Sequence, residues 1–389
     1  MNYKICVVSG TRAEYGLLRN LIRRISKKNE FKLQLVITGS HLSAEHGMTI
    51  DEVKTDGFPI DKCINILTGD DTNTGMAKAV SLGIEKFANY FLNANPDIII
   101  VLGDRYEIFA VVSAAAIMKI PVAHIHGGET SQGAIDEYFR HAITKMSVLH
   151  FVAAKEYAQR VIRMGEQPNT VHNVGSLGVE NISAMPLLSR NELQDKIKFP
   201  LEKPYALVTY HPETLSDRLV EKDISSLIKA LEIWIHKDNN VIITKANADA
   251  GGQIINAAID DFSKENTAVF ACESLGTTQY LSAMKHCRMV IGNSSSGIVE
   301  APSFHIPTIN IGDRQKGRLM ADSIINCEPE FDSIIKAIRR ADADDFRSKL
   351  TKTVNPYGDG ETSQKIVEII KERFASESIS IVKTFYDKE

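Results

Sequence analysis

The sequence predicts an α/β protein made of two Rossmann-like domains, each with a parallel sheet, and a cleft between the domains. Short β-branched apolar runs alternate with amphipathic helical segments along most of the chain, which is typical of parallel sheets covered by helices. This alternation stops in a proline-bearing stretch, residues 176–203, and then starts again. The length of 389 residues also suits two domains. We therefore expect one sheet in each half of the chain.

The first domain is predicted from seven short apolar runs that read as strands. They cover residues 3–8, 32–38, 60–66, 97–102, 121–126, 148–153 and 170–174. Helices are expected after residue 16, up to about residue 93, and over residues 106–118 and 155–164. In the first of these helices the leucines and isoleucines of residues 17–25 fall on one stripe and the basic residues fall off it. This domain is assigned to residues 1–180.

The second domain is predicted from five further apolar runs. They cover residues 205–210, 241–244, 267–271, 289–291 and 307–311. Helices are expected over residues 219–236 and 362–374, and directly after the GNSSSG segment at residues 292–297. We assign the second domain to residues 200–365, with residues 366–389 as a C-terminal helix and tail.

Composition and charge exclude several classes of partner. The 45 basic and 49 acidic residues give a net charge of −4, so there is no general basic field for nucleic acid or a membrane surface. Five scattered cysteines without a CxxC pair indicate neither a zinc cluster nor a disulfide framework. The chain runs straight into a strand without a signal peptide, and no apolar run approaches the roughly 18 residues of a membrane helix. We expect a cytoplasmic homodimer or homotetramer without metal or cofactor.

Candidate catalytic residues follow two successive predicted strands of the first domain. Asp104 and Arg105 come after residues 97–102, and His126 and Glu129 come at the end of residues 121–126, with Asp136 a few residues later. Because ligands bind at the carboxyl ends of parallel strands, these side chains are expected at one edge. Acids mixed with an imidazole and a fixed cation suit proton transfer next to a charged leaving group. The alternative is that they are helix caps and solvated loop charges.

Two further candidates in the first domain are binding residues. Arg12 follows Gly10 between the first strand and its helix, where a helix N-terminus favours an anion. The turn has neither the GxGxxG pattern of a dinucleotide site nor a Walker lysine. His41 follows the second strand and is assigned to a sugar hydroxyl; a plain loop residue is the alternative.

The second domain carries a predicted nucleotide site at its strand ends. GNSSSG combines two glycines with hydroxyls and backbone N–H groups at a helix start, a way of holding a diphosphate without metal. A serine-rich capped turn is the alternative reading. Glu300, placed about two turns into the helix, is expected to accept from ribose hydroxyls. The remaining assigned binding residues are Arg105, His211, Asn247, Ser294, Ser295 and Arg314.

Several motifs together resemble one enzyme family. GTRAEYG, LGDRYE, HIHGGE, AIDEYFRHAITKMS, YHPET, GNSSSGIVE and NIGDRQKGR occur in order over nearly the whole chain. They look like those of the hydrolysing UDP-N-acetylglucosamine 2-epimerases of bacterial sialic acid biosynthesis. The resemblance implies a GT-B fold, no metal, no nicotinamide, and release of N-acetylmannosamine and UDP.

The same resemblance implies roles for individual residues. Asp104 matches a catalytic aspartate, and the UDP-binding positions match Arg12, His211, Ser294, Ser295, Glu300 and Arg314. Some family members carry glutamate where this chain has His126, with one residue fewer before the aspartate that matches Asp136. The general base is therefore either Glu129 or His126.

The chemistry can be argued from the substrate. The C2 hydrogen of an N-acetylhexosamine becomes acidic only as the C1–O bond to UDP stretches, so the departing diphosphate must be stabilised first. A base then removes the C2 proton to give 2-acetamidoglucal. Water adds at C1 while an acid protonates C2 from the opposite face, so two proton-transfer groups are needed.

Three alternatives to this activity remain. A GT-B glycosyltransferase would need an acceptor site in addition to the UDP half. A nucleotide-sugar sensor would bind without turnover, which the dense acid and imidazole group argues against. Within the enzyme class, the nearest alternative substrate is a UDP-2,4-diacetamido-trideoxyhexose of the legionaminic acid pathway.

Overall fold

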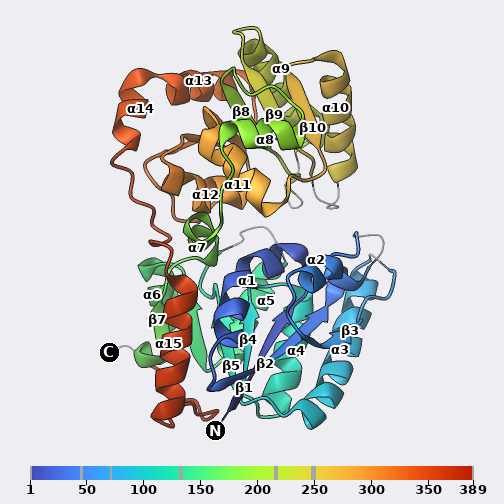
Figure 1. The fold of residues 1–389 in the computed structure, drawn as a ribbon, viewed down its shortest axis with the longest axis vertical. Helices are drawn as coiled ribbons and strands as arrows, with labels where there is room; N and C mark the ends of the chain where they lie inside the picture. Colours follow the sequence, from blue (N-terminus) through green and yellow to red (C-terminus); the bar gives the residue numbers. More distant parts are fainter. Residues whose placement is uncertain are drawn as a thin grey trace. The chain divides into compact units, whose positions relative to one another are not determined.

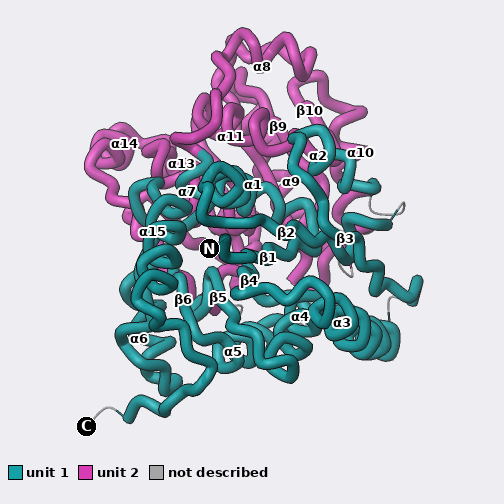
Figure 2. The backbone as a smooth tube through the Cα atoms, turned by 60° about the horizontal axis from the view of Figure 1, so that its bottom comes forward, with its two compact units in different colours: residues 1–129, 135–181, 357–389 teal, residues 130–134, 182–356 magenta. Residues whose placement is uncertain are grey.

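The chain folds into two compact units, each with its own sheet and core. The computed structural model describes residues 2–43, 47–70, 72–130, 135–213, 218–246 and 251–387. The first unit contains residues 1–129, 135–181 and 357–389, and the second contains 130–134 and 182–356 (Figure 2). The first unit therefore holds both ends of the chain.

The first unit is a seven-stranded parallel sheet in the order β3-β2-β1-β4-β5-β6-β7 (Figure 1). Its strands are β1 (Tyr3–Ser9), β2 (Phe31–Thr38), β3 (Ile60–Ile64), β4 (Ile98–Leu102), β5 (Val122–Ile125), β6 (Leu149–Val152) and β7 (Val171–Asn173). Its helices are α1 (Arg12–Ser26), α2 (Ile50–Thr55), α3 (Asn73–Ala94), α4 (Tyr106–Ile117), α5 (Asp136–Met146), α6 (Lys155–Arg163) and α15 (Thr362–Ala375), with 3₁₀ turns η1 (Gly39–Leu42) and η2 (Pro168–Thr170). Helix α7 (Leu177–Ala184) begins in this unit and ends in the second.

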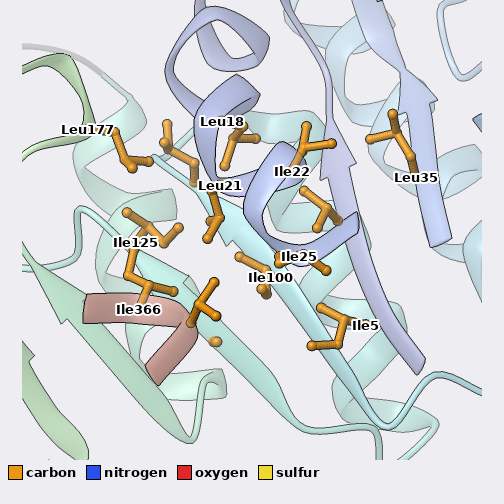
Figure 3. Packing of buried hydrophobic residues seen from close by; sticks show 14 of the residues in the cluster. Ile5, Leu18, Leu21, Ile22, Ile25, Leu35, Ile100, Ile125, Leu177 and Ile366 are labelled. Carbon is orange, nitrogen blue, oxygen red and sulfur yellow. The ribbon is translucent and has the colours of Figure 1, made fainter. Parts of the chain in front are cut away.

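Apolar side chains pack in a separate layer on each face of this sheet. On one face the stripe of α1, including Leu18, Leu21 and Ile25, packs against the strands together with Ile366 from α15 (Figure 3). On the other face, side chains of α3 and α4 such as Phe87 and Val111 form the second layer. Both layers are almost fully excluded from water, so apolar burial fixes the sheet and leaves its strand ends for polar residues.

The second unit repeats this plan with six parallel strands in the order β10-β9-β8-β11-β12-β13. They are β8 (Tyr205–Thr209), β9 (Asn240–Thr244), β10 (Val269–Cys272), β11 (Met289–Gly292), β12 (Thr308–Ile311) and β13 (Ile324–Cys327). The helices are α8 (Arg190–Ile197), α9 (Val220–Ile235), α10 (Gly252–Glu265), α11 (Gly276–His286), α12 (Ser295–Val299), α13 (Phe331–Asp342) and α14 (Asp344–Leu350), with the 3₁₀ turn η3 (Ala301–Phe304). Two apolar layers again cover the two faces of the sheet.

Two features differ from the sequence-based assignment of domains. The stretch 176–203, expected to be a linker, contains α7 and α8. The helix and tail that were left outside both domains belong to the first unit, since Ile366, Val367 and Ile370 of α15 join its core. The first unit is therefore closed by the end of the chain.

None of the helices in the described ranges is both long and apolar enough to cross a membrane.

Candidate active site

Strand order points to one edge of each sheet. In the first sheet the order reverses between β1 and β4, and in the second it reverses between β8 and β11. Ligands of open parallel sheets bind beside such a reversal, at the carboxyl ends of the strands. The segments there are Gly10–Arg12 and Gly103–Arg105 in the first unit, and His211–Glu213 and Asn293–Ser295 in the second. The predicted site residues are concentrated in these segments and in the loop after β5.

Asp104 lies just after β4 and is ion-paired with a buried arginine of α5. The pair joins the Asp104 carboxylate to Nη2 of Arg140, whose Nη1 lies 3.6 Å from Glu137. Helix α5 begins at Asp136, so Asp136 and Arg140 are one turn apart on the same helix. Burial and the nearby Asp104 charge raise the pKa of Asp136. A carboxyl group with a raised pKa thus lies near a second carboxylate that is paired with an arginine.

His126 and Glu129 form a second acid–base pair after β5. His126 Nδ1 lies 3.5 Å from Glu129 Oε1, and both side chains are largely buried. The backbone of His126 is left-handed, with φ of 67°, a conformation that costs a non-glycine residue about 1–2 kcal/mol. The turn is supported by Arg160 of α6, which donates to the carbonyl of Gly128. Strain held in place by such support is typical of functional positions.

Arg105 is held by a buried carboxylate beneath the same edge. Its Nε and Nη2 each donate to Glu107 at 3.1 Å, and Glu107 is buried. Glu14 of α1 lies nearby and accepts the Gly10 N–H at 2.7 Å. Burial and repulsion from Glu107 raise the pKa of Glu14 to about 8. The Arg105 side chain is still 43% exposed, so the guanidinium can also reach a ligand.

Arg12 begins α1, and its side chain is 41% exposed. Its Nε lies 3.5 Å from Glu52 of α2, an exposed pair that contributes little to stability. Thr11 caps the helix by accepting from the Glu14 N–H. The position is compatible with the expected anion contact.

His41, expected to contact a sugar hydroxyl, is buried in the structure. Its side chain is completely buried, with Nε2 3.0 Å from Ser9 Oγ and Nδ1 2.8 Å from Thr49 Oγ1. Burial lowers its pKa to about 4. With no exposed surface and a partner at each nitrogen, the ring supports the loop after β2 instead of facing a ligand.

In the second unit, Asn293 joins the two segments at the reversal of strand order. Its side chain accepts from the His211 N–H and donates to the His211 carbonyl, both at 2.8 Å. The Asn293 carbonyl in turn accepts from Arg314 Nη1 at 3.2 Å and from Gln315 Nε2 at 2.9 Å. One buried asparagine therefore fixes two predicted UDP-binding residues, His211 and Arg314, relative to each other.

The loop after β12 is fixed a second time through Glu213. Its Oε1 accepts from the backbone N–H groups of Asp313 and Arg314, at 2.8 and 3.2 Å. Burial and the positive charge of Arg314 lower the pKa of His211 to about 4. A neutral imidazole beside an arginine can donate one hydrogen bond to a phosphate oxygen without adding charge.

The serine segment forms a short hydroxyl network. Ser294 is the N-cap of α12, and its Oγ lies 2.9 Å from Ser296 Oγ, which is 2.8 Å from the Tyr280 hydroxyl. Ser295 is exposed. The expected position of Glu300 is wrong: α12 has only five residues, and Glu300 is its C-cap and not a residue two turns along a helix. Asn247 lies outside the described residues.

Several residues of these networks were not among the sequence-predicted site residues. Glu137 directly follows the assigned Asp136, Arg140 follows it at i, i+4 spacing, and Asn293, Gln315 and Glu213 lie inside the quoted motifs. The i, i+4 spacing in α5 was an available signal for Arg140. Contacts made through backbone groups leave no such signal. The residues of these networks that were not assigned from the sequence are Glu14, Glu107, Glu137, Arg140, Glu213, Tyr280, Asn293 and Gln315.

Comparison with known proteins shows the family to which this chain is similar. Residues 23–371 match the family described as UDP-N-acetylglucosamine 2-epimerase. The hydrolysing GDP/UDP-N,N'-diacetylbacillosamine 2-epimerase of Campylobacter jejuni is 41% identical over 345 residues, covering 88% of each chain. The polysialic acid biosynthesis protein P7 of Escherichia coli is 39% identical over 384 residues, covering 99% of this chain and 97% of that protein.

A solved structure supports the fold. The UDP-GlcNAc 2-epimerase of Neisseria meningitidis, determined with bound UDP-GlcNAc, superposes with a TM-score of 0.80 at 19% identity, covering 95% of this chain and 100% of that one. At this identity the likeness shows the fold alone. The predicted α/β architecture of two Rossmann-like parallel-sheet domains, of GT-B-like type, is confirmed.

Proposed function

The chain belongs to the UDP-N-acetylglucosamine 2-epimerase family, and from that premise we propose that it is a hydrolysing epimerase that converts UDP-N-acetylglucosamine and water to N-acetylmannosamine and UDP, for sialic acid biosynthesis. The proposal rests on one structural observation. Two separate acid–base groups, His126 with Glu129 and Asp136 with Asp104, follow the paired strands β4 and β5. An elimination followed by an addition on the opposite face needs two such groups.

The second unit supplies the proposed UDP contacts. His211 and Arg314 are held by Asn293 and present an imidazole and a guanidinium. Ser294 and Ser295 offer hydroxyls at the neighbouring strand end. Cationic and hydrogen-bond donors of this kind stabilise the negative charge that develops as the C1–O bond to the diphosphate breaks. Arg12 and Arg105, whose side chains are partly exposed, are the further proposed binding residues in the first unit.

In the elimination, the His126–Glu129 pair takes the C2 proton. The electron pair of the C2–H bond forms the C1–C2 double bond, and the C1–O bond breaks to release UDP. We assign this step to His126 and Glu129 because they lie 3.5 Å apart, so that a proton taken by one is stabilised by the other.

In the hydration, Asp136 returns a proton to C2. Water forms a bond to C1 and loses a proton to a neighbouring carboxylate, while the double bond takes up the proton of Asp136 from the opposite face. The assignment rests on the pKa of Asp136, which burial and the Asp104 charge raise. A carboxyl group whose pKa is raised by its surroundings commonly acts as the general acid.

A second candidate substrate is UDP-N,N'-diacetylbacillosamine. The relative that is 41% identical is named for the hydrolysing 2-epimerase of that sugar, linked to GDP or UDP. The same elimination and hydration at C1 and C2 apply to it, because the two sugars differ only at C4 and C6.

The activity is tested by incubating the purified chain with each UDP-sugar in EDTA without added cofactor, in D₂O. We expect UDP release and a 2-epimerised free sugar with deuterium at C2, seen by NMR. Release of N-acetylglucosamine, or product with protium at C2, would contradict the elimination. The sugar that gives the higher kcat/KM identifies the substrate.

The two proton-transfer roles are tested by product partition. Asp136→Asn should still release UDP but accumulate 2-acetamidoglucal, because only the hydration loses its acid. Glu129→Gln and His126→Asn should instead slow UDP release, by about 10²–10⁴-fold, without accumulating the glucal. The reverse pattern would exchange the two assignments, and unchanged kcat in all three variants would remove these residues from the mechanism.

A further inference from the structure

A fully buried histidine links the groups that follow β4 and β5. His124 lies in β5, and its Nε2 is 2.8 Å from the Gly103 carbonyl oxygen. Its Nδ1 is 3.1 Å from the Thr144 hydroxyl of α5. A carbonyl oxygen can only accept, so Nε2 carries the proton and Nδ1 accepts from Thr144. Burial lowers the pKa of the ring to about 3, which keeps it neutral.

These two hydrogen bonds join the same segments that an ion pair already joins. Gly103 directly precedes Asp104, and Thr144 is one turn beyond Arg140 on α5. Asp104 and Arg140 are themselves paired. The loop after β4 and the helix that begins with Asp136 are thus tied together twice, once by a charged pair and once by a neutral ring.

The turn that carries the other acid–base pair rests on the same ring. A Cβ placed on Gly127 would lie 3.0 Å from His124 Nδ1 and 3.0 Å from Thr144 Oγ1. The glycine therefore lets the backbone next to His126 come directly against the imidazole and the hydroxyl. One ring in this way contacts the Asp104 loop, the His126 turn and α5.

We propose that His124 is a positioning residue that sets the relative placement of both proton-transfer groups through a neutral ring protonated on Nε2, an inference that rests on the proposed function of those groups. His124 itself is excluded from water and engages both nitrogens within the protein, so it acts through Asp104, His126 and Asp136. Misplacement of catalytic groups by about 1 Å can reduce a rate by about 10²-fold.

The kinetic test uses His124→Asn, Thr144→Val and Thr144→Ser. Asparagine removes the contact to Gly103, valine removes the hydroxyl at nearly constant shape, and serine keeps it. We expect His124→Asn and Thr144→Val to lower kcat by roughly 10–100-fold, to displace the pH profile of kcat and to leave UDP affinity unchanged. Thr144→Ser should restore both kcat and the pH profile toward wild type.

His150→Asn is the matched control. His150 is the register partner of His124 on β6, is equally buried, and bonds Glu166 at 3.0 Å, a residue that belongs to neither proposed proton-transfer group. The His150→Asn variant should unfold more easily than wild type but keep the wild-type kcat and the wild-type pH profile of kcat. If His124→Asn alters kcat and its pH profile no more than His150→Asn does, the positioning role is overturned.

A separate measurement does not depend on activity. Nitrogen-15 NMR of labelled histidines, with His124 assigned from the His124→Asn spectrum, should show a neutral ring protonated on Nε2 from pH 6 to 8. The other tautomer, or a ring that becomes charged in that range, would overturn the inference even in an active enzyme. If wild type turns over neither UDP-sugar while this tautomer is found, the proposed function fails and the hydrogen-bonded arrangement stands.

Discussion

Histidines that look alike in the sequence differ in this chain by what surrounds each ring. His126 has a strained backbone and a carboxylate 3.5 Å away. His41 and His124 are sealed in the first unit with both nitrogens engaged. His211 lies at a strand end of the second unit, where burial and Arg314 lower its pKa to about 4. Sequence position identified the strand ends correctly, but side-chain environment decides which ring can act on a substrate.

Burial of His41 predicts a loss of stability in acid. Its pKa is about 4 in the folded chain and about 6.5 when unfolded, so below pH 6.5 the unfolded state takes up the proton first. The stability it contributes is present above pH 6.5 and is lost as pH falls toward 4, by about 2 kcal/mol at pH 5. Urea denaturation of His41→Gln should show a weaker pH dependence between pH 7.5 and 5 than wild type. His236→Gln, at an exposed helix end, is the control; equal slopes for wild type and His41→Gln would contradict the prediction.

The proposed UDP contacts predict an effect on binding in the second unit. Arg314→Ala should weaken UDP binding by about 1.5–3 kcal/mol, and Ser294→Ala by about 0.5–1.5 kcal/mol, since one loses a charged and the other a neutral hydrogen bond. Isothermal titration with UDP measures both. Lys316→Ala removes an exposed cation of the same loop that pairs with Asp313 and should have a smaller effect. If UDP affinity is unchanged in both test variants, the nucleotide does not bind at these residues.

Turns at the ends of strands define the candidate site at the scale of elements. Gly292 ends β11 with φ of 136°, and a Cβ there would lie 1.9 Å from the Thr209 carbonyl oxygen of β8. The close approach brings the end of β11 against the end of β8, so that Asn293 can bond the backbone of His211. Only glycine adopts this backbone region without strain.

Gly292→Ala should therefore disturb both folding and the nucleotide site. Steric overlap with β8 and the unfavourable φ should cost at least about 1–3 kcal/mol and weaken UDP binding by displacing Asn293. Gly276→Ala is a matched control, because its φ of 66° is also positive but its Cβ would meet no atom within 4 Å. Both variants carry backbone strain, but only Gly292→Ala also creates a close contact. Comparing their thermal unfolding and their UDP titration therefore separates the two effects. Similar UDP affinities would show that β8 and β11 tolerate separation.

The elements that sequence patterns predicted share one physical feature. Buried central strands such as β4 and β8 are continuous apolar runs, and burial on both faces leaves that signal in the sequence. Strand β13 was missed because it is short and only partly buried. The networks around Asp104 and Asn293 were missed because they depend on backbone carbonyls and on helices brought together by the fold. The sequence therefore predicted the strand ends, whereas the hydrogen-bond and ion-pair partners of the site residues are seen only in the structure.

At the scale of the molecule, the first unit is completed only by the end of the chain. The chain leaves this unit after residue 181 and returns at residue 357. The Ser176 N–H donates to the Tyr357 carbonyl at 2.7 Å, and Glu180 accepts from the Ser363 N–H at 2.7 Å. Helix α15 then packs on α1 in the apolar core (Figure 3). Residues separated by about half the chain thus stabilise one core, which favours slow, late completion of this unit.

The C-terminal tail is tied to the first unit by a buried carboxylate. Lys383 Nζ lies 2.6 Å from Glu166, which also bonds Lys145 at 2.6 Å and His150 at 3.0 Å. These partners outweigh burial and lower the pKa of Glu166 to about 2, so the contribution of the charged carboxylate is present above about pH 4.5 and is lost as pH falls toward 2. Lys383 also donates to the carbonyls of Lys145 and Ser147.

Lys383→Met should therefore lower the free energy of unfolding at pH 7 by about 1–3 kcal/mol, less than the roughly 3–5 kcal/mol of a fully broken buried pair, because Lys145 and His150 remain. Lys365→Met removes a cation from an exposed pair with Asp359 and should cost no more than about 1 kcal/mol. Urea denaturation compares the two, and the difference should shrink as pH falls from 4.5 toward 2. UDP affinity should stay at the wild-type value, because Lys383 contacts Glu166, Lys145 and Ser147, which are not residues assigned to the nucleotide. Equal stability of the two variants at pH 7 would show that the tail does not hold the first unit together.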